Sequence, residues 1–287
     1  MRGIILSAMV STVVLTSCDI IDDPALDLGF VYNEDLYGPA PSFSPAPSSE
    51  HFKRVIIEDF TGHECGNCPT AHHIAEDLDT QYGDSLAVVA AHVTDLAAPN
   101  LPDFPAEYRT NEGNAWWAPF DGLGIPIGRV NRSGGISNPW PYTLWGSEVT
   151  AQFAQSPLAV LQMQVEYVEE NNDLNVHVYT EFLEGLTGTY NLAVVILESH
   201  IVSPQLEYLP QPFVWEEYEH NHMLRGSITG PFGLQIVSNP EANSSVLKSY
   251  TYGWNSNWIP ENCAVLAMLI DNSNGEIVNS VEAEIGE

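Results

Sequence analysis

Apolar positions along residues 53–155 follow two different spacings. Residues 53–60 contain a β-branched run that predicts a buried strand, and residues 85–93 contain a second apolar run of the same kind. Between them, apolar residues recur every three or four positions, which predicts a helix over 70–82. Its apolar positions are Ala71, Ile74, Ala75 and Leu78. Three further elements are predicted in order: a helix near 106–117, a strand over 124–130 and a helix over 142–155.

From residue 157 onward the spacing changes to a period of two, which is typical of half-buried strands. Leu161, Met163, Val165 and Tyr167 fall on one face, and Asn and Asp residues at 171–173 turn the chain. The further strands predicted are 174–178, 190–199, 246–254, 264–271 and 276–284. The pattern therefore predicts an α/β domain over 52–156 followed by an all-β sandwich over 157–287, most similar to an immunoglobulin-like arrangement.

The first 17 residues are typical of an export signal. Met1-Arg2 is a short basic start, and residues 3–16 form an apolar stretch shorter than a membrane span. The string Leu15-Thr16-Ser17-Cys18 resembles the lipobox of bacterial lipoproteins, which implies cleavage before Cys18 and acylation of its thiol, palmitate included. We therefore expect a signal peptide over 1–17 and a membrane anchor at Cys18. The alternative is an ordinary signal peptide with an incidental cysteine.

Residues 18–51 are predicted to be a tether. The run Pro39–Ser49 (PAPSFSPAPSS) is rich in proline and serine, as extended spacers are. About 30 such residues reach on the order of 100 Å at full extension. The acidic residues Asp19, Asp22 and Asp23 follow the cysteine and resemble a surface-export signal of some Gram-negative lineages. We therefore expect an outer membrane lipoprotein, periplasmic or surface-exposed.

Charge and composition limit the classes of partner that the chain can bind. The chain of 287 residues carries 8 Lys+Arg against 38 Asp+Glu, so its surface repels nucleic acid and anionic lipid headgroups. No phosphate-binding loop or serine nucleophile motif is evident, and we predict no cofactor. The four cysteines are too few for a disulfide-stapled scaffold, so each is assessed singly.

The spacing of Cys65 and Cys68 indicates redox chemistry. Two cysteines separated by two residues at a helix N-terminus can close a small disulfide, and the helix end favours the thiolate of the first. That thiolate attacks a substrate disulfide, and the second cysteine resolves the mixed disulfide. Three interpretations stay open: an exchange-competent pair, a structural disulfide, or half of a zinc site completed by His63, His72 or His73.

The surroundings of this motif resemble the thioredoxin superfamily. Asp59-Phe60 precedes Cys65 as a buried acid and a phenylalanine do in thioredoxins, and Ile125-Pro126 follows in the order of their cis-proline loop. The resemblance implies a thioredoxin-like fold for the α/β domain, proton transfer by Asp59, and a peptide groove shaped by Pro126. Glu64 and Asn67 depart from the usual thioredoxin motif. Glu64 would raise the pKa of Cys65, whereas His63, if protonated, would lower it.

A second resemblance is to the Omp28 family of outer membrane lipoproteins. It rests on the string from Asp59 to Pro69 (DFTGHECGNCP) together with Tyr218–Arg225 (YEHNHMLR). The family implies an envelope location, but no defined activity.

His220 and His222 alternate along the chain and would make only an incomplete metal site. Cys263 opens an apolar strand and is interpreted as an inert buried thiol. We therefore predict thiol–disulfide exchange on exported proteins, with Cys65 attacking, Cys68 resolving, and Asp59 and Pro126 assisting. The alternative is a surface-exposed binding or adhesion lipoprotein in which Cys65–Cys68 is a structural disulfide.

Overall fold

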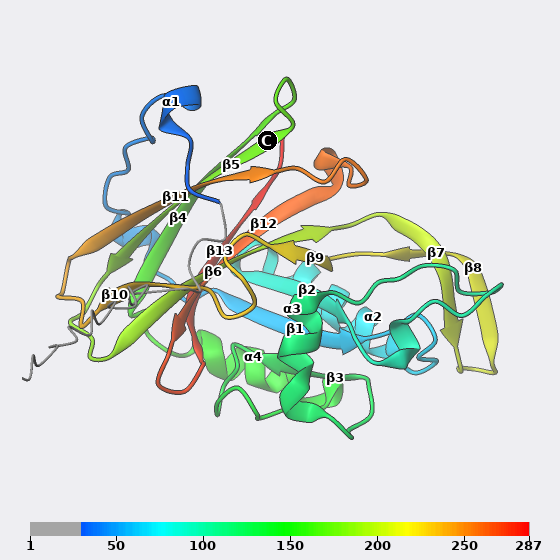
Figure 1. The fold of residues 1–287 in the computed structure, drawn as a ribbon. Coiled ribbons are helices and arrows are strands. Elements are labelled where there is room, and N and C mark those ends of the chain that lie inside the picture. The colour runs from blue at the N-terminus through cyan, green and yellow to red at the C-terminus, as the bar shows by residue number, and fades with distance from the viewer. Residues whose placement is uncertain (1–29, 287) are drawn as a thin grey trace, which may run out of the picture.

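The computed structural model describes residues 30–286, which fold mainly into β-strands arranged in three sheets (Figure 1). The helices are α1 (Glu34–Tyr37), α2 (Cys68–Tyr82), α3 (Asn111–Trp117) and α4 (Trp145–Phe153). The strands of the first half are β1 (Val55–Thr61), β2 (Leu86–His92) and β3 (Ile127–Val130). Those of the second half are β4 (Ala159–Val168), β5 (Asp173–Phe182), β6 (Thr189–Glu198), β7 (Ile201–Glu207), β8 (Phe213–His220), β9 (Met223–Ser227), β10 (Leu234–Ser238), β11 (Ser245–Gly253), β12 (Cys263–Asp271) and β13 (Ile277–Glu284).

The largest sheet has eight strands and runs through both halves of the chain. Its order is β13-β12-β6-β9-β2-β1-β3, with β10 also paired to β6. Strand β9 joins the two halves, because it lies antiparallel to β6 and parallel to β2, where the Ala90 N–H donates to the His222 carbonyl over 2.8 Å. Strands β4, β5 and β11 form a second sheet, and β7 and β8 form a separate hairpin.

One apolar core is shared by residues from both halves. Ile56, Phe60 and Val89 of β1 and β2 belong to the same cluster as Val195 of β6 and Leu266 of β12, and all five are buried. The fold class expected from sequence, an α/β thioredoxin-like domain followed by an all-β immunoglobulin-like sandwich, is therefore wrong. Strands that were predicted for two separate domains instead pair within one sheet of a mostly β fold.

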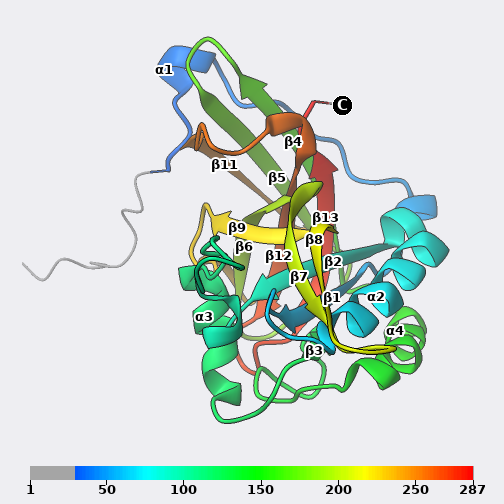
Figure 2. The same cartoon turned by 90° about the vertical axis from the view of Figure 1, so that its right-hand side faces the viewer.

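Helices cover both faces of the large sheet at its β1–β3 end. Figure 2 shows α3 on one side of these strands and α2 with α4 on the other. Every residue of β1 and of β2 is buried, because apolar layers lie against both faces. The period-two alternation expected of a strand with one wet face is consequently absent there.

A buried charge cluster fastens β1 to β3. Glu58 forms ion pairs with Arg129 and Arg132, 2.6 Å from Arg129 Nε and 2.7 Å from Arg132 Nη2, and all three side chains are at most 1% exposed. The Arg129 guanidinium also lies over the Phe60 ring, 5.1 Å from its centroid. These groups face away from α2 on the α3 side of β1, and sequence analysis did not single them out.

The described part of the predicted tether contacts the three-stranded sheet. Phe30 packs against its core, the Tyr37 hydroxyl donates to Asp173 over 2.6 Å, and the Ala46 N–H donates to Glu181 over 3.0 Å. Residues 30–51 thus lie along β4, β5 and β11 instead of standing free in solvent. The predicted signal peptide over 1–17 and Cys18 lie outside the described residues. Between residues 30 and 286 no helix has both the length and the apolar character needed to span a bilayer.

Candidate functional site

The Cys65–Cys68 pair lies where β1 passes into α2. Strand β1 ends at Thr61, and two tight turns follow, in which the Cys65 N–H donates to the Gly62 carbonyl and the Cys68 N–H to the Cys65 carbonyl. Helix α2 then begins at Cys68, with Pro69 in its first turn, where the missing proline N–H removes no helical hydrogen bond. The two cysteines form a disulfide with their Cα atoms 5.4 Å apart.

Both sulfur-bearing residues are nearly inaccessible. Cys65 is 4% exposed and Cys68 is fully buried. Cys65 Sγ lies 3.7 Å from the Ile125 carbonyl oxygen, and the Ile125–Pro126 peptide bond is cis. The structure therefore brings Pro126 and the disulfide together, in the order that the thioredoxin resemblance implied. The first sulfur does not face open solvent.

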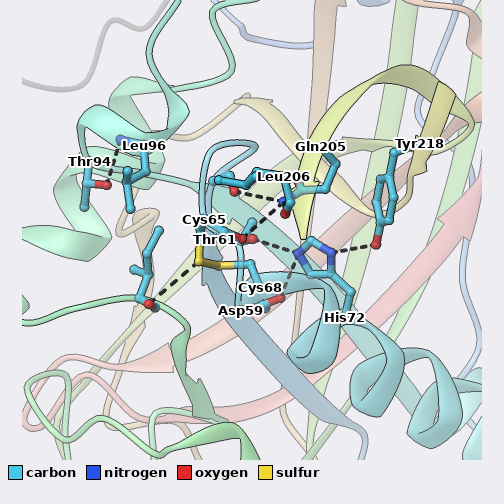
Figure 3. Close-up of a disulfide and its surroundings, with 12 residues drawn as sticks. Asp59, Thr61, Cys65, Cys68, His72, Thr94, Leu96, Gln205, Leu206 and Tyr218 are labelled. Carbon is cyan, nitrogen blue, oxygen red and sulfur yellow. Dashed lines mark hydrogen bonds and ion pairs between the residues drawn. A yellow bond between two sulfur atoms is a disulfide. The ribbon is translucent and has the colours of Figure 1, made fainter. Parts of the chain in front are cut away.

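The β7–β8 hairpin covers the disulfide loop. The Leu206 N–H donates to the His63 carbonyl over 2.8 Å, and the Tyr208 N–H donates to the Gly66 carbonyl over 2.7 Å. Gln205 Nε2 donates to the Cys65 carbonyl over 3.3 Å (Figure 3). Through these bonds the end of β7 pairs with the backbone of the disulfide loop. Strand β7 was not predicted from the sequence, because Pro204 interrupts its run and few of its apolar positions are buried.

Asp59 lies close to Cys68, on the side of the disulfide where His72 lies (Figure 3). Its side chain is 1% exposed, and burial raises the pKa of the carboxyl to about 8. Within residues 30–286, Oδ1 has no hydrogen-bond partner. The carboxyl is therefore mainly protonated at neutral pH, which suits a group that exchanges a proton with a neighbouring thiol.

His72, one turn into α2, connects Asp59 to the hairpin. Its Nε2 lies 2.7 Å from Thr61 Oγ1 and 3.5 Å from Asp59 Oδ2, and its Nδ1 lies 2.9 Å from the Tyr218 hydroxyl. Burial, together with the nearby His220 and His73, lowers the pKa of His72 to about 3. At neutral pH the contact with Asp59 is therefore one between two uncharged groups. Sequence analysis considered His72 only as a zinc ligand and gave Tyr218 no role beyond the Omp28-like string.

Both residues before Cys65, His63 and Glu64, bond to the segment that follows β2. His63 is 1% exposed, donates from Nε2 to the Ala98 carbonyl over 3.0 Å and stacks on Phe104. Burial lowers the pKa of His63 below its ordinary value, so the ring is neutral at pH 7 and does not favour a thiolate. Glu64 accepts from Asn100 Nδ2 over 2.8 Å and is turned to that side chain.

His220 and His222, the two alternating histidines, have different surroundings. His220 is buried beside His92, at 5.6 Å between ring centroids, whereas the backbone carbonyl of His222 supports the β2–β9 junction. Across the described residues, no group of three or more His, Cys, Asp or Glu side chains is arranged to hold a metal ion. Cys263 is buried, and burial together with Glu198 raises the pKa of its thiol to about 12, so it stays protonated.

A family model described as outer membrane protein Omp28 matches residues 114–287, which is more than half of the chain. The chain belongs to the Omp28 family. The resemblance stated from the motifs is thereby confirmed, and membership supports a location in the cell envelope. The matched segment begins after Cys65 and Cys68, so it does not bear on the disulfide.

Two solved structures align with this Omp28-family protein, and the first of them shares its overall fold. HBP35 of Porphyromonas gingivalis aligns with a TM-score of 0.62 and 17% identity, covering 82% of this chain and 76% of that chain. A domain of the outer membrane lipoprotein Omp28 from Porphyromonas gingivalis aligns with a TM-score of 0.31 and 22% identity, covering 45% of this chain and 88% of that chain. No protein in the curated set matches.

Proposed function

We propose that this Omp28-family protein exchanges disulfides with exported proteins of the cell envelope through Cys65 and Cys68. The observation that carries the proposal is the disulfide at the start of α2, with the protonated Asp59 close to Cys68 and the Ile125 carbonyl 3.7 Å from Cys65 Sγ. A purely structural disulfide has no need of a buried carboxyl whose charged form is disfavoured. Thiol–disulfide exchange does need such a group, because the resolving thiol must lose its proton inside the protein.

The exchange needs only sulfur chemistry. In the reducing direction the Cys65 thiolate attacks a substrate disulfide, forms a mixed disulfide and releases one substrate sulfur as a thiolate. The Cys68 thiolate then attacks Cys65 Sγ, closes the protein disulfide and releases the second substrate sulfur. Two electrons pass to the substrate, and the two protons that leave the cysteines balance its two new thiols. The reverse sequence oxidises a substrate dithiol.

Exposed apolar side chains beside the loop suit a polypeptide substrate. Tyr208, Leu209, Phe213 and Trp215, at the end of the hairpin, are each 45–61% exposed. Tyr208 contacts Gly66 directly, so the apolar surface begins at the disulfide loop itself. An unfolded exported chain offers apolar segments that would pack there.

A trapping experiment tests the proposal. Cys68→Ser keeps the attacking thiol and removes the resolving one, so we expect mixed disulfides with exported proteins to accumulate through Cys65. Cys65→Ser should abolish exchange, and Cys263→Ser should leave it intact because that thiol is buried and protonated. Equal activity of the Cys65→Ser and wild-type proteins would refute the assignment.

The alternative function is a binding lipoprotein with a static disulfide. Burial of both cysteines beneath the hairpin favours it, because a disulfide that is at most 4% exposed is shielded from partners. In that case the Cys68→Ser protein would trap nothing, and both cysteine variants would lose only stability.

Attachment to the membrane through an acylated Cys18 is part of the proposal. It is supported by the Leu15–Cys18 string and by membership of an outer membrane family. Cys18→Ser should move the protein from the membrane fraction to the soluble fraction of the envelope. Retention of that variant in the membrane fraction would contradict acylation at Cys18 as the anchor.

A further inference from the structure

A line of polar groups leads from the disulfide to strand β8 of the hairpin. Asp59 lies next to Cys68, His72 lies between Asp59 and β8, and Tyr218 projects from β8 onto His72 (Figure 3). The separations are 3.5 Å from Asp59 Oδ2 to His72 Nε2 and 2.9 Å from His72 Nδ1 to the Tyr218 hydroxyl. Exposure rises along the line, from 1% at Asp59 to 12% at His72, and Tyr218 is only half-buried.

The attack of Cys68 on the mixed disulfide requires a path for its proton to reach solvent. Cys68 is fully buried and Asp59 nearly so, which means that a proton leaving the Cys68 thiol cannot pass directly to bulk water. Of the two carboxyl oxygens, Oδ1 has no hydrogen-bond partner among the described residues, and Oδ2 faces His72. The polar exit from Asp59 therefore runs through the His72 ring.

We propose that His72 and Tyr218 relay a proton from Asp59 to solvent during the attack of Cys68 on the mixed disulfide. This inference rests on the exchange function proposed above. Asp59 gives its proton to His72 Nε2, the ring releases its Nδ1 proton to the Tyr218 oxygen, and Tyr218 passes its own hydroxyl proton to water. The carboxylate so formed takes the Cys68 proton, and the thiolate attacks Cys65 Sγ. One proton moves from thiol to water, and the electron pair of the broken bond leaves with the substrate sulfur.

The surroundings of His72 keep the ring fixed and neutral. The bond between Thr61 Oγ1 and Nε2, 2.7 Å long, sets the ring orientation. A cavity of about 20 Å³ beside the ring has room for one water molecule. The titratable groups that line it are Asp59 on β1, Glu76 on α2, His92 on β2, Tyr218, Glu219 and His220 on β8, and His222 after β8. His73, on α2, faces outward and bonds to Glu76.

The test separates the two chemical steps. Reduced protein is mixed with glutathione disulfide, quenched with acid and analysed by mass, which gives the rates of mixed-disulfide formation and of its resolution across pH 5–9. We expect Tyr218→Phe and His72→Gln to slow resolution at least about tenfold and to leave formation unchanged, in line with the contribution of general acid–base groups. His73→Gln, one residue away and 65% exposed, should change neither rate.

A second measurement distinguishes proton transfer through Tyr218 from a purely structural role of that side chain. Tyr218→Phe removes a single oxygen, so it is the deciding variant if His72→Gln does not fold. In it the carboxyl pKa of Asp59, followed by infrared absorption, should stay raised while resolution slows. Resolution at the wild-type rate throughout the pH range would overturn the relay and leave the exchange function standing. Failure of the wild-type protein to form a mixed disulfide at all would overturn both.

Discussion

Tyr208 lies across Gly66, with its ring so close that a methyl group added to Gly66 would stand 2.3 Å from the ring atom Cδ1. The same pair is joined by a 2.7 Å hydrogen bond from the Tyr208 N–H to the Gly66 carbonyl. A residue inside the Cys65–Cys68 loop is thus fitted to a hairpin about 140 positions later in the chain. Glycine is needed here for close approach of the hairpin, not for an unusual backbone angle.

We predict that Gly66→Ala destabilises the protein by about 1–3 kcal/mol, the usual range for overpacking. The added methyl forces the Tyr208 ring off the loop. In a Tyr208→Ala background the same substitution should be nearly neutral, because the space is already open. Urea unfolding of the wild type, the two single variants and the double variant measures the coupling free energy between Gly66 and Tyr208. Equal destabilisation by Gly66→Ala in both backgrounds would show that the ring is not the obstacle.

Removal of the Tyr208 ring should also uncover the disulfide. We expect Tyr208→Ala to speed reduction of Cys65–Cys68 by a small thiol severalfold, because the residue that covers the loop is lost. Trp215→Ala is the matched control: its ring is on the same hairpin and similarly exposed, and its Nε1 bonds to Glu207 instead of the loop. Similar acceleration in both variants would mean that general loosening of the hairpin, not cover by Tyr208, limits access.

Asp59 makes stability depend on pH in a defined direction. Its folded pKa is raised from 3.8 to about 8, so its contribution is fully present below pH 3.8 and is lost as pH rises through 8. Asp59→Asn, which stays neutral, should therefore exceed the wild type in unfolding free energy at pH 8, by about 2 kcal/mol or more. The advantage should shrink steadily toward pH 4. A difference independent of pH, measured by urea titration, would contradict the raised pKa.

The Glu58 cluster gives a separate prediction about the junction of β1 and β3. Glu58→Gln leaves two buried guanidinium groups without a counter-charge, so we expect a loss of about 3–5 kcal/mol. Glu107→Gln removes a carboxylate from a partly exposed pair with Arg109 and should cost less than about 1 kcal/mol. Thermal unfolding of both variants checks the contrast. Equal losses would indicate that burial of the Glu58 cluster adds nothing to its strength.

Local features of the disulfide region were predictable from sequence. The apolar run over 53–60 indicated β1, the three- and four-residue spacing indicated α2, and the Cys65/Cys68 spacing indicated a pair at its start. Each of these depends on neighbours within a few residues, where sequence pattern carries the information. The nearness of Pro126 to the disulfide followed from the thioredoxin resemblance.

The sheet arrangement was not predictable in the same way. Strand β2 is buried on both faces, so its pattern does not reveal that β9 pairs with one of its edges. Strand β9 spans only five residues, and its pairing depends on contacts far apart in the chain. The roles of His72 and Tyr218 were missed for the same reason: they are 146 positions apart and meet only because the hairpin folds back over α2.

The reduction potential of the Cys65–Cys68 pair tests the exchange function most directly. The soluble protein, without residues 1–18, is equilibrated across a glutathione series, and the free thiols are trapped by alkylation and counted by mass. We predict a potential between about −120 and −270 mV, the span of known exchange proteins. A pair still oxidised below about −300 mV, as structural disulfides are, would contradict the exchange function and favour the binding lipoprotein.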